Sequence, residues 1–235
     1  AQENIKETAM FDFSLTWVFQ KLAMIPAILI ALTFHELSHG YVAYRLGDNT
    51  AKSQGRLSLN PIHHLDPIGT LCLLFIGFGW AKPVPVNPYA LHKKPKTGMA
   101  WVAAAGPASN LCMALIGGIL LMFYMKLVGQ GWLYQSGFGV ALFVGLFLIY
   151  FIQINIVLMI FNLIPIPPLD GSRIVSVFLP TSARYRYNLL ERYGTLIMLV
   201  LCVFPIGGTT VISWILNAPV QYLSGLIYSL AGLSI

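Results

Sequence analysis

The chain has 235 residues, of which 57% are hydrophobic and only 9% are charged, and its mean hydropathy is +0.74. Because a soluble domain carries about 25% charged residues, this composition excludes an ordinary soluble protein and indicates a membrane protein that crosses the bilayer several times. The net charge of +6 comes from Lys and Arg residues in short loops between apolar segments. Membrane topology explains that distribution better than nucleic-acid binding, so no nucleic-acid partner is expected.

A polar tail, residues 1–12, precedes the first apolar segment. Met10 is a candidate native start, so residues 1–9 are read either as a remnant of expression or as an ordinary tail. The rest of the chain carries no composition break that would mark a second domain. Residues 1–235 are therefore expected to form a single membrane-embedded domain.

The first apolar segment, residues 15–46, contains the pattern His35-Glu36-x-x-His39. At 1.5 Å per residue a helix of this length crosses a hydrocarbon core of about 30 Å. Residues four apart share a helix face, so the two His side chains can bind one metal ion with Glu36 beside them. The segment has almost no polar residues on its other faces, unlike the corresponding helix of a soluble metalloprotease. The pattern therefore predicts a zinc site inside a membrane.

The region between the first and second apolar segments predicts short, irregular elements. Residues 56–60 alternate between polar and apolar types, as in a short strand. Residues 68–80 are apolar but too few for an ordinary spanning helix, which favours a re-entrant or partly embedded segment. Residues 81–88 contain a proline at alternate positions and form an edge strand at best. A short re-entrant or β-hairpin region is therefore expected here.

Further apolar segments follow at residues 99–125, 138–163 and 194–216, with a shorter one after Pro219. Together with the first segment they predict an all-α polytopic membrane protein with about five to six transmembrane helices. If residues 68–80 do not cross, three basic loops share one side of the membrane, and the positive-inside rule makes that side cytoplasmic. The expected location is a bacterial-type cell membrane, with His39 at the cytoplasmic end of its span.

A catalytic zinc takes three protein ligands, so a third residue must join the two His residues. Asp170 ends a stretch of about thirty uncharged residues, where an unpaired carboxylate is costly. The prolines before it keep the backbone extended, and such backbone is tolerated at membrane depth only inside protein or beside a wet cavity. We favour Asp170 as the third ligand. The alternative is an ordinary helix end with Asp170 as a capping residue.

The other acidic and histidine residues have more ordinary explanations as loop residues. Asp48 is read as a helix-end residue, Asp66 as a turn residue before a proline, and Glu191 as a surface partner of Arg192. The remaining histidines are expected to be solvated loop residues: His63, His64 and His92.

Four sequence blocks, read in order, resemble the site-2 protease family of intramembrane zinc metalloproteases. The blocks are His35-Glu36-x-x-His39, Ser58-Leu59-Asn60-Pro61 with Asp66-Pro67-Ile68-Gly69, Gly106-Pro107-x-x-Asn110, and Asn162-x-x-Pro165-x-Pro167-Pro168-Leu169-Asp170-Gly171. The resemblance implies that His35, His39 and Asp170 bind one Zn²⁺ per chain and that Glu36 is the catalytic acid/base. Many members carry an added PDZ or CBS domain. No stretch here is long or polar enough for either, which indicates the minimal form.

The implied reaction is hydrolysis of peptide bonds within or near transmembrane segments of membrane-protein substrates, as in regulated intramembrane proteolysis. Zinc activates a water molecule, and Glu36 takes its proton and passes it to the leaving amine. Asn162 is a candidate donor to the oxyanion or to the substrate backbone, or an amide that ties down the helix end. Asn110 is expected to bond to neighbouring backbone. Residues 82–87 either pair with an unwound substrate as a strand or form a rigid loop.

Other functional classes remain open at this point. A membrane metal transporter or metal sensor would use the same ligands but would have little need of Glu36. A di-iron oxidase is a weaker alternative, because the chain has only five histidines. A prenyl-type membrane protease would require Glu191 as the third ligand. The expected partners are a transmembrane-protein substrate and the lipid bilayer, and the sequence makes no prediction of the oligomeric state.

Overall fold

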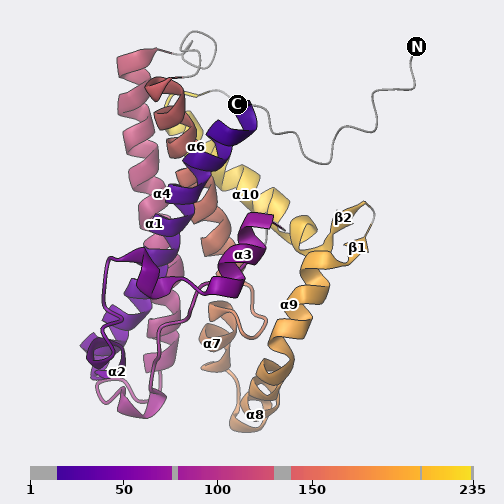
Figure 1. The fold of residues 1–235 in the computed structure, drawn as a ribbon. Helices are drawn as coiled ribbons and strands as arrows, with labels where there is room; N and C mark the ends of the chain where they lie inside the picture. Colours follow the sequence, from indigo (N-terminus) through magenta and orange to yellow (C-terminus); the bar gives the residue numbers. More distant parts are fainter. Residues whose placement is uncertain (1–14, 76–78, 130–138, 207, 234–235) are drawn as a thin grey trace.

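The computed structural model describes residues 15–75, 79–129, 139–206 and 208–233, and these are mostly helical. Three helices are long and apolar enough to cross a membrane: α1 (Leu15–Leu46), α4 (Gly98–Val128) and α6 (Val140–Leu163). They pack side by side as the central bundle (Figure 1). Their bounds lie within three residues of the predicted ones, although residue 138 and the polar tail fall outside the described residues.

The buried face of α1 explains how the bundle packs so closely. Ala23, Ala27, Ala31 and Ala43 are completely buried, and they lie at multiples of four residues, in one i, i+4 row that winds gradually around the helix. Small residues let neighbouring helices approach closely in a membrane, where packing drives helix association. The two histidines of the H-E-x-x-H pattern occupy the next positions of the same row, between the third and the last of these alanines. The sequence therefore places the candidate ligands inside the bundle.

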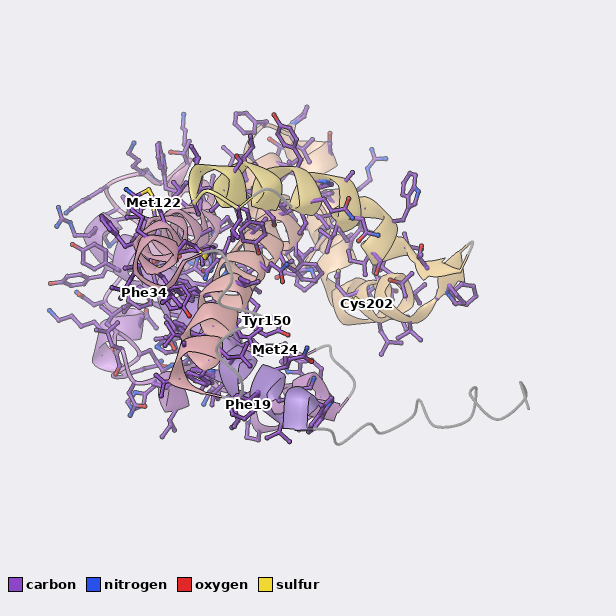
Figure 2. All side chains as sticks on the ribbon, turned by 90° about the horizontal axis from the view of Figure 1, so that it is seen from above. Phe19, Met24, Phe34, Met122, Tyr150 and Cys202 are labelled. Atoms are coloured by element: carbon purple, nitrogen blue, oxygen red, sulfur yellow. The ribbon has the colours of Figure 1, made fainter. Side chains whose placement is uncertain are left out.

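The outer face of the bundle is apolar, as expected for contact with lipid. On α4 eight large apolar side chains are exposed: Trp101, Leu111, Leu115, Ile116, Ile119, Leu120, Phe123 and Leu127. Figure 2 shows side chains projecting outward around the bundle, with Met122 labelled on the same helix. Exposing such an apolar face to water is unfavourable, whereas contact with the hydrocarbon core of a bilayer is favourable.

The region after α1 contains short helices and extended backbone: α2 (Thr50–Ser53), η1 (Pro61–His64), α3 (Pro67–Phe75) and η2 (Pro88–Ala90). With 9 residues, α3 is about 13 Å long and too short to cross a membrane. The predicted hairpin is not confirmed, since the pairing within this described region is one isolated bridge, Leu65 with Ala81.

The predicted strand at residues 56–60 is wrong. The hydroxyl of Ser58 accepts a hydrogen bond from the backbone N–H of Asn60, and the side chain of Asn60 accepts one from Ile62. Such local side-chain bonds compete with a strand ladder and turn the chain. The turn leads directly into η1 at Pro61.

Residues 82–87, which we call the strap, are extended and held at both ends. The backbone N–H of Lys82 donates to the His64 carbonyl, and the Lys82 carbonyl accepts from Arg56 at 2.8 Å. At the other end, the N–H of Asn87 donates to the Asp48 carboxylate at 2.7 Å. The strap is therefore anchored to the loop that follows α1.

Three sequence interpretations of polar loop residues need correction. Asp48 is completely buried and anchors the strap, rather than serving only as a helix-end residue. His64 is buried rather than solvated, with its ring Nε2 donating to the Ser58 carbonyl. Glu191 pairs with Arg173 at 3.4 Å, not with Arg192.

The predicted span at residues 194–216 is also wrong. After α7 (Asp170–Ser176), α8 (Thr181–Leu189) and η3 (Leu190–Tyr193), the chain forms α9 (Gly194–Val203), which has only ten residues. Pro205 ends it, because the residue before a proline is driven out of the helical region. A small antiparallel pair follows, β1 (Pro205–Ile206) with β2 (Thr209–Thr210).

The last helix, α10 (Val211–Leu230), passes through Pro219, where a separate span was expected to begin. It packs on the bundle through Ile227 and Tyr228, which join Leu121 of α4 and Ile152 of α6 in one apolar core. Its amide and hydroxyl residues lower its hydropathy, and it is not among the three candidate spans. The predicted five to six spans are therefore not confirmed.

Candidate metal centre

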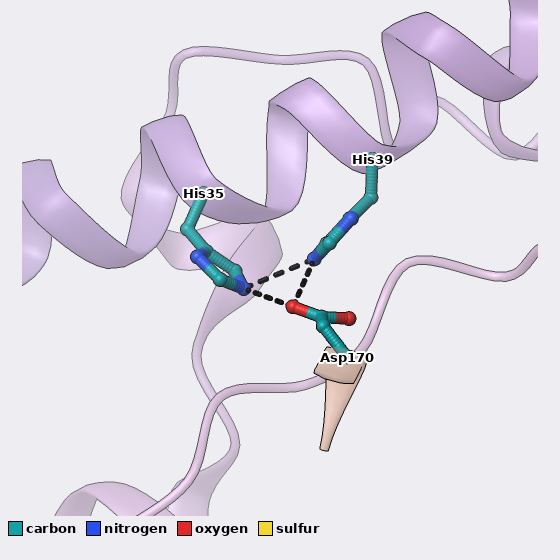
Figure 3. A group of neighbouring side chains, drawn as sticks. All are labelled: His35, His39 and Asp170. Carbon is teal, nitrogen blue, oxygen red and sulfur yellow. Dashed lines mark hydrogen bonds and ion pairs between the residues drawn. The ribbon is translucent and has the colours of Figure 1, made fainter. Parts of the chain in front are cut away.

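Two elements far apart in sequence meet at the candidate metal centre. Figure 3 shows His35 and His39 projecting from α1 towards Asp170, the first residue of α7. The Nε2 atoms of the two histidines are 3.0 Å apart, and each lies 3.2 Å from Oδ2 of Asp170. All three side chains are largely buried, with exposed fractions of 6%, 11% and 14%. The structure thus brings together the three residues predicted as ligands.

The other ring nitrogen of each histidine is held by a hydrogen bond. His39 Nδ1 lies 2.7 Å from the Val102 carbonyl, which can only accept, so this nitrogen carries the proton. His35 Nδ1 lies 2.6 Å from Oδ1 of Asn110, also an acceptor. Each ring therefore turns an unprotonated Nε2 towards the centre. Asn110 was expected to bond to neighbouring backbone, and its contact with His35 on α1 corrects that expectation.

This arrangement fits a divalent metal ion. Two nitrogen lone pairs and a carboxylate oxygen converge, and among the described residues Asp170 Oδ2 has no hydrogen-bond donor although it is buried. Such a group of acceptors is repulsive unless a cation lies between them. Ligands about 2.0–2.1 Å from a tetrahedral zinc lie about 3.3 Å from one another, close to the observed separations. No other group of three His, Cys, Asp or Glu residues with this proximity occurs in the described part of the chain.

The start of α7 packs so closely against the end of α6 that position 171 requires glycine. The helix α6 ends at Leu163, and Ile164 takes an extended conformation with φ −61° and ψ 129°. A Cβ atom at Gly171 would collide with the carbonyl oxygens of Leu163 and Ile164. The close packing of Gly171 against this helix end thus places Asp170 beside the histidines.

Glu36 lies one residue along α1 from His35, and its Oε2 accepts a hydrogen bond from the backbone N–H of Val84 at 2.9 Å. The strap therefore crosses the centre directly beside Glu36. A cavity of about 140 Å³ opens here, which is room for several water molecules. Its wall includes the three candidate ligands, Glu36, and strap residues Pro83, Val84 and Val86.

Asn162 and Arg173 also line this cavity. One N–H of the Asn162 amide donates to the Leu158 carbonyl at 3.0 Å, one helical turn back. This bond agrees with an amide that ties down the helix end. The second N–H of the amide could still donate to the oxyanion or to the substrate backbone, so both interpretations of Asn162 stay open. Arg173 was not singled out by the sequence, although it lies three residues after Asp170 and hence on the same face of α7.

Comparison with known proteins agrees with the geometry. The model of peptidase family M50 matches residues 134–205. Two relatives bear curated names of the form "Putative zinc metalloprotease". YwhC of Bacillus subtilis is 45% identical over 196 residues, covering 82% of this chain and 87% of the relative. Rip2 of Mycolicibacterium smegmatis is 30% identical over 195 residues, covering 81% and 70%. No solved structure matches the chain significantly.

These matches confirm the resemblance to site-2 proteases and do not support the alternatives of a transporter, a sensor or an oxidase. The three apolar helices agree with an integral membrane protein. Zinc is the metal named for the relatives, and the cluster of His35, His39 and Asp170 is a fitting site for it. The chain belongs to peptidase family M50 and is a zinc metalloprotease.

Proposed function

We propose that the protein is an intramembrane protease that hydrolyses peptide bonds within or near transmembrane segments of membrane-protein substrates. One zinc ion is held by His35, His39 and Asp170, and Glu36 is the general acid/base. The observation that carries this proposal is the convergence of three buried ligand atoms beside Glu36, at the interior face of a candidate membrane span. The described residues act as one membrane-embedded catalytic domain.

The depth of the centre supports cleavage inside the bilayer. Since α1 ends at Leu46, His39 lies about 10 Å from that end by helix rise. The centre is then below the membrane surface, near the end of the bundle that carries most of the basic residues. By the positive-inside rule this end faces the cytoplasm, and the host is a bacterial-type cell membrane.

The chemistry assigned to the chain is general acid–base catalysis. Zinc, when bound, supplies Lewis acidity and lowers the pKa of a water molecule to about 7. Glu36 accepts the proton of that water and later delivers it to the leaving amine. The second N–H of Asn162, which has no partner among the described residues, lies in the cavity wall and donates to the oxyanion or to the substrate backbone.

Substitution of Glu36 tests this mechanism. Glu36→Gln keeps an oxygen that can accept from Val84 but cannot take a proton, so cleavage of a membrane-embedded substrate should fall by about 10²- to 10⁴-fold. Zinc content, measured by metal analysis of purified protein, should remain at one per chain. Asp170→Ala should instead lose both zinc and activity. Full activity of Glu36→Gln would exclude the mechanism, and normal zinc content of Asp170→Ala would exclude the ligand set.

We also propose that the strap receives the substrate as an added strand. Prolines at 83 and 85 lack N–H groups, so the donors within this part of the strap belong to Val84 and Val86. In extended backbone, alternate residues point their N–H groups the same way. Val84 donates towards Glu36, and the N–H of Val86 has no partner among the described residues. An unwound substrate can therefore pair along the edge that faces the cavity.

Removing the N–H of Val86 tests substrate pairing. Val86→Pro should slow cleavage of a transmembrane substrate by about 2- to 10-fold, the value of one hydrogen bond, without loss of zinc. The matched control is Val86→Ala, which shortens the side chain but keeps the N–H and should cleave at nearly the wild-type rate. Equal rates for Val86→Pro and wild type would argue against strand pairing.

A further inference from the structure

Two buried asparagines connect the candidate metal centre to the rest of the bundle. Asn110 on α4 and Asn155 on α6 are both completely buried between candidate spans. A buried amide is costly unless its donors and acceptors are satisfied. Their hydrogen bonds form one chain that begins on α6 and ends at the ring of His35 on α1.

The chain of hydrogen bonds has a defined direction. Asn155 Nδ2 donates to the backbone carbonyl of Phe151 at 2.8 Å, which can only accept, so the other end of this amide is an oxygen. That oxygen accepts from Asn110 Nδ2 at 2.8 Å, and the Asn110 amide therefore presents its own oxygen to His35. A second acceptor, the Ala31 carbonyl at 3.3 Å from Asn110 Nδ2, supports the same orientation.

We propose that Asn155 and Asn110 are positioning residues for the metal centre, which act as a relay that holds His35 with its proton on Nδ1. This tautomer leaves Nε2 unprotonated and directed at Asp170, as metal binding requires. The inference rests on the ligand set proposed above. It adds that His35 depends on the amide of Asn155 on a third helix, whereas His39 is held by the backbone carbonyl of Val102.

The same two amides would also be present if they only held the helices together. Interhelical hydrogen bonds between polar side chains are a common source of membrane-helix association. A purely adhesive role predicts that removing Asn155 lowers stability without changing the His35 ring. A positioning role predicts a change at His35 that does not occur at His39. The two histidines therefore provide an internal comparison.

The experiment uses the full chain in detergent micelles with Asn155→Leu, which keeps the number and branching of the side-chain heavy atoms but removes the acceptor of Asn110. Without that acceptor, only the longer bond to the Ala31 carbonyl still opposes a turn of the Asn110 N–H₂ towards His35, and such a turn favours a proton on Nε2. Nitrogen NMR of ¹⁵N-histidine-labelled, metal-free protein should show an increased Nε2–H fraction at His35 and no change at His39. Zinc titration should show about 10- to 100-fold weaker binding, the usual effect of losing an outer-shell partner.

Two further variants keep the proposal falsifiable. Ile152→Ala removes a buried side chain on the same helix, and should lower stability without changing the His35 tautomer or, in folded protein, the zinc affinity. Asn155→Asp, when its carboxyl is protonated, still donates to Phe151 and accepts from Asn110, and should bind zinc within about threefold of wild type. An unchanged His35 ring and unchanged zinc affinity in folded Asn155→Leu would overturn the relay. That result would leave the ligand set intact, since Asp170→Ala tests it separately.

Discussion

At the scale of single residues, the candidate centre depends on the absence of a side chain as much as on the ligands. An added Cβ atom at Gly106 would lie 2.5 Å from Nε2 of His39 and 2.6 Å from Cε1 of His35. Both distances are well below van der Waals contact. The hydrogen atom at this position therefore lets α4 approach α1 until its carbonyl and amide groups reach the two imidazole rings.

Gly106→Ala should consequently weaken zinc binding while leaving the bundle folded. Overpacking a close-packed site costs about 1–3 kcal/mol, which corresponds to about 5- to 150-fold in zinc affinity, measured by competition with a chelator. The matched control is Gly118→Ala on the same helix, whose Cβ would meet the Cγ2 methyl of Ile227, away from the centre. Equal zinc affinity in the two variants would contradict this account.

The sequence predicts some residues of the centre better than others. The spacing of His35, Glu36 and His39 is local, because a single helix sets their geometry. Asp170 could be predicted because few carboxylates occur in apolar sequence. The roles of Asn110 and Asn155 depend on which helix faces meet, and no local pattern contains that information.

At the scale of elements, the strap shows how loop residues support the centre. Asp48 receives hydrogen bonds from the backbone and hydroxyl of Thr50 and from the backbone of Asn87. Although burial by itself would raise the pKa of Asp48, these hydrogen bonds hold the pKa below its ordinary value. The ionised carboxylate is therefore the form that stabilises the fold.

Asp48→Asn should destabilise the protein by about 2 kcal/mol at neutral pH, because one acceptor becomes a donor that faces another donor. The lowered pKa gives the pH dependence its sign. The stabilisation by ionised Asp48 is complete above the unfolded pKa of about 3.9 and is lost as pH falls through the lower folded value. Thermal unfolding in micelles should therefore show a difference between variant and wild type that is constant from pH 5 to 7 and narrows below about pH 4.

Glu191→Gln is the control for this prediction, since it removes a carboxylate whose ion pair with Arg173 is exposed. Exposed pairs contribute little to stability, so its melting temperature should stay close to that of wild type. If Asp48→Asn unfolds at the wild-type temperature, the strap is not anchored as described.

The long central helices were predicted well because an uninterrupted apolar segment in a bilayer has few alternatives to a helix. The segment at residues 194–216 was predicted poorly for a related reason. Hydropathy averages over a window and gives little weight to one proline, yet Pro205 ends α9 and begins β1. In the same way, residues 56–60 alternate like a strand, but side-chain bonds from Ser58 and Asn60 divert the backbone.

At the scale of the whole molecule, the basic residues and the candidate catalytic residues lie at the same end of the bundle. Among the described residues, every Lys and Arg except Lys21 and Lys126 lies in the last turn of α1 or in the shorter helices and connecting segments outside the three spans. Figure 1 shows α2 and α8 at the same end of the bundle. The opposite end carries the last turn of α4 and the first turn of α6. This asymmetry supports a cytoplasmic position for the centre.

Labelling of single cysteines tests this orientation. In a variant whose native cysteines Cys72, Cys112 and Cys202 are replaced by Ser, a new Cys is introduced at Ser53, Ser182 or Lys126, all exposed positions. A membrane-impermeant maleimide should label Lys126→Cys in intact cells, and Ser53→Cys and Ser182→Cys only in inside-out vesicles.

The outcomes separate the fold from its orientation. Labelling of Ser53→Cys and Ser182→Cys from opposite sides would contradict the three-helix arrangement, because α1, α4 and α6 place both residues at one end. Labelling of both positions only from outside would agree with the fold but would show that its orientation in the membrane is inverted. The predicted result means that substrate is cut about 10 Å inside the cytoplasmic boundary, so the released soluble fragment would enter the cytoplasm.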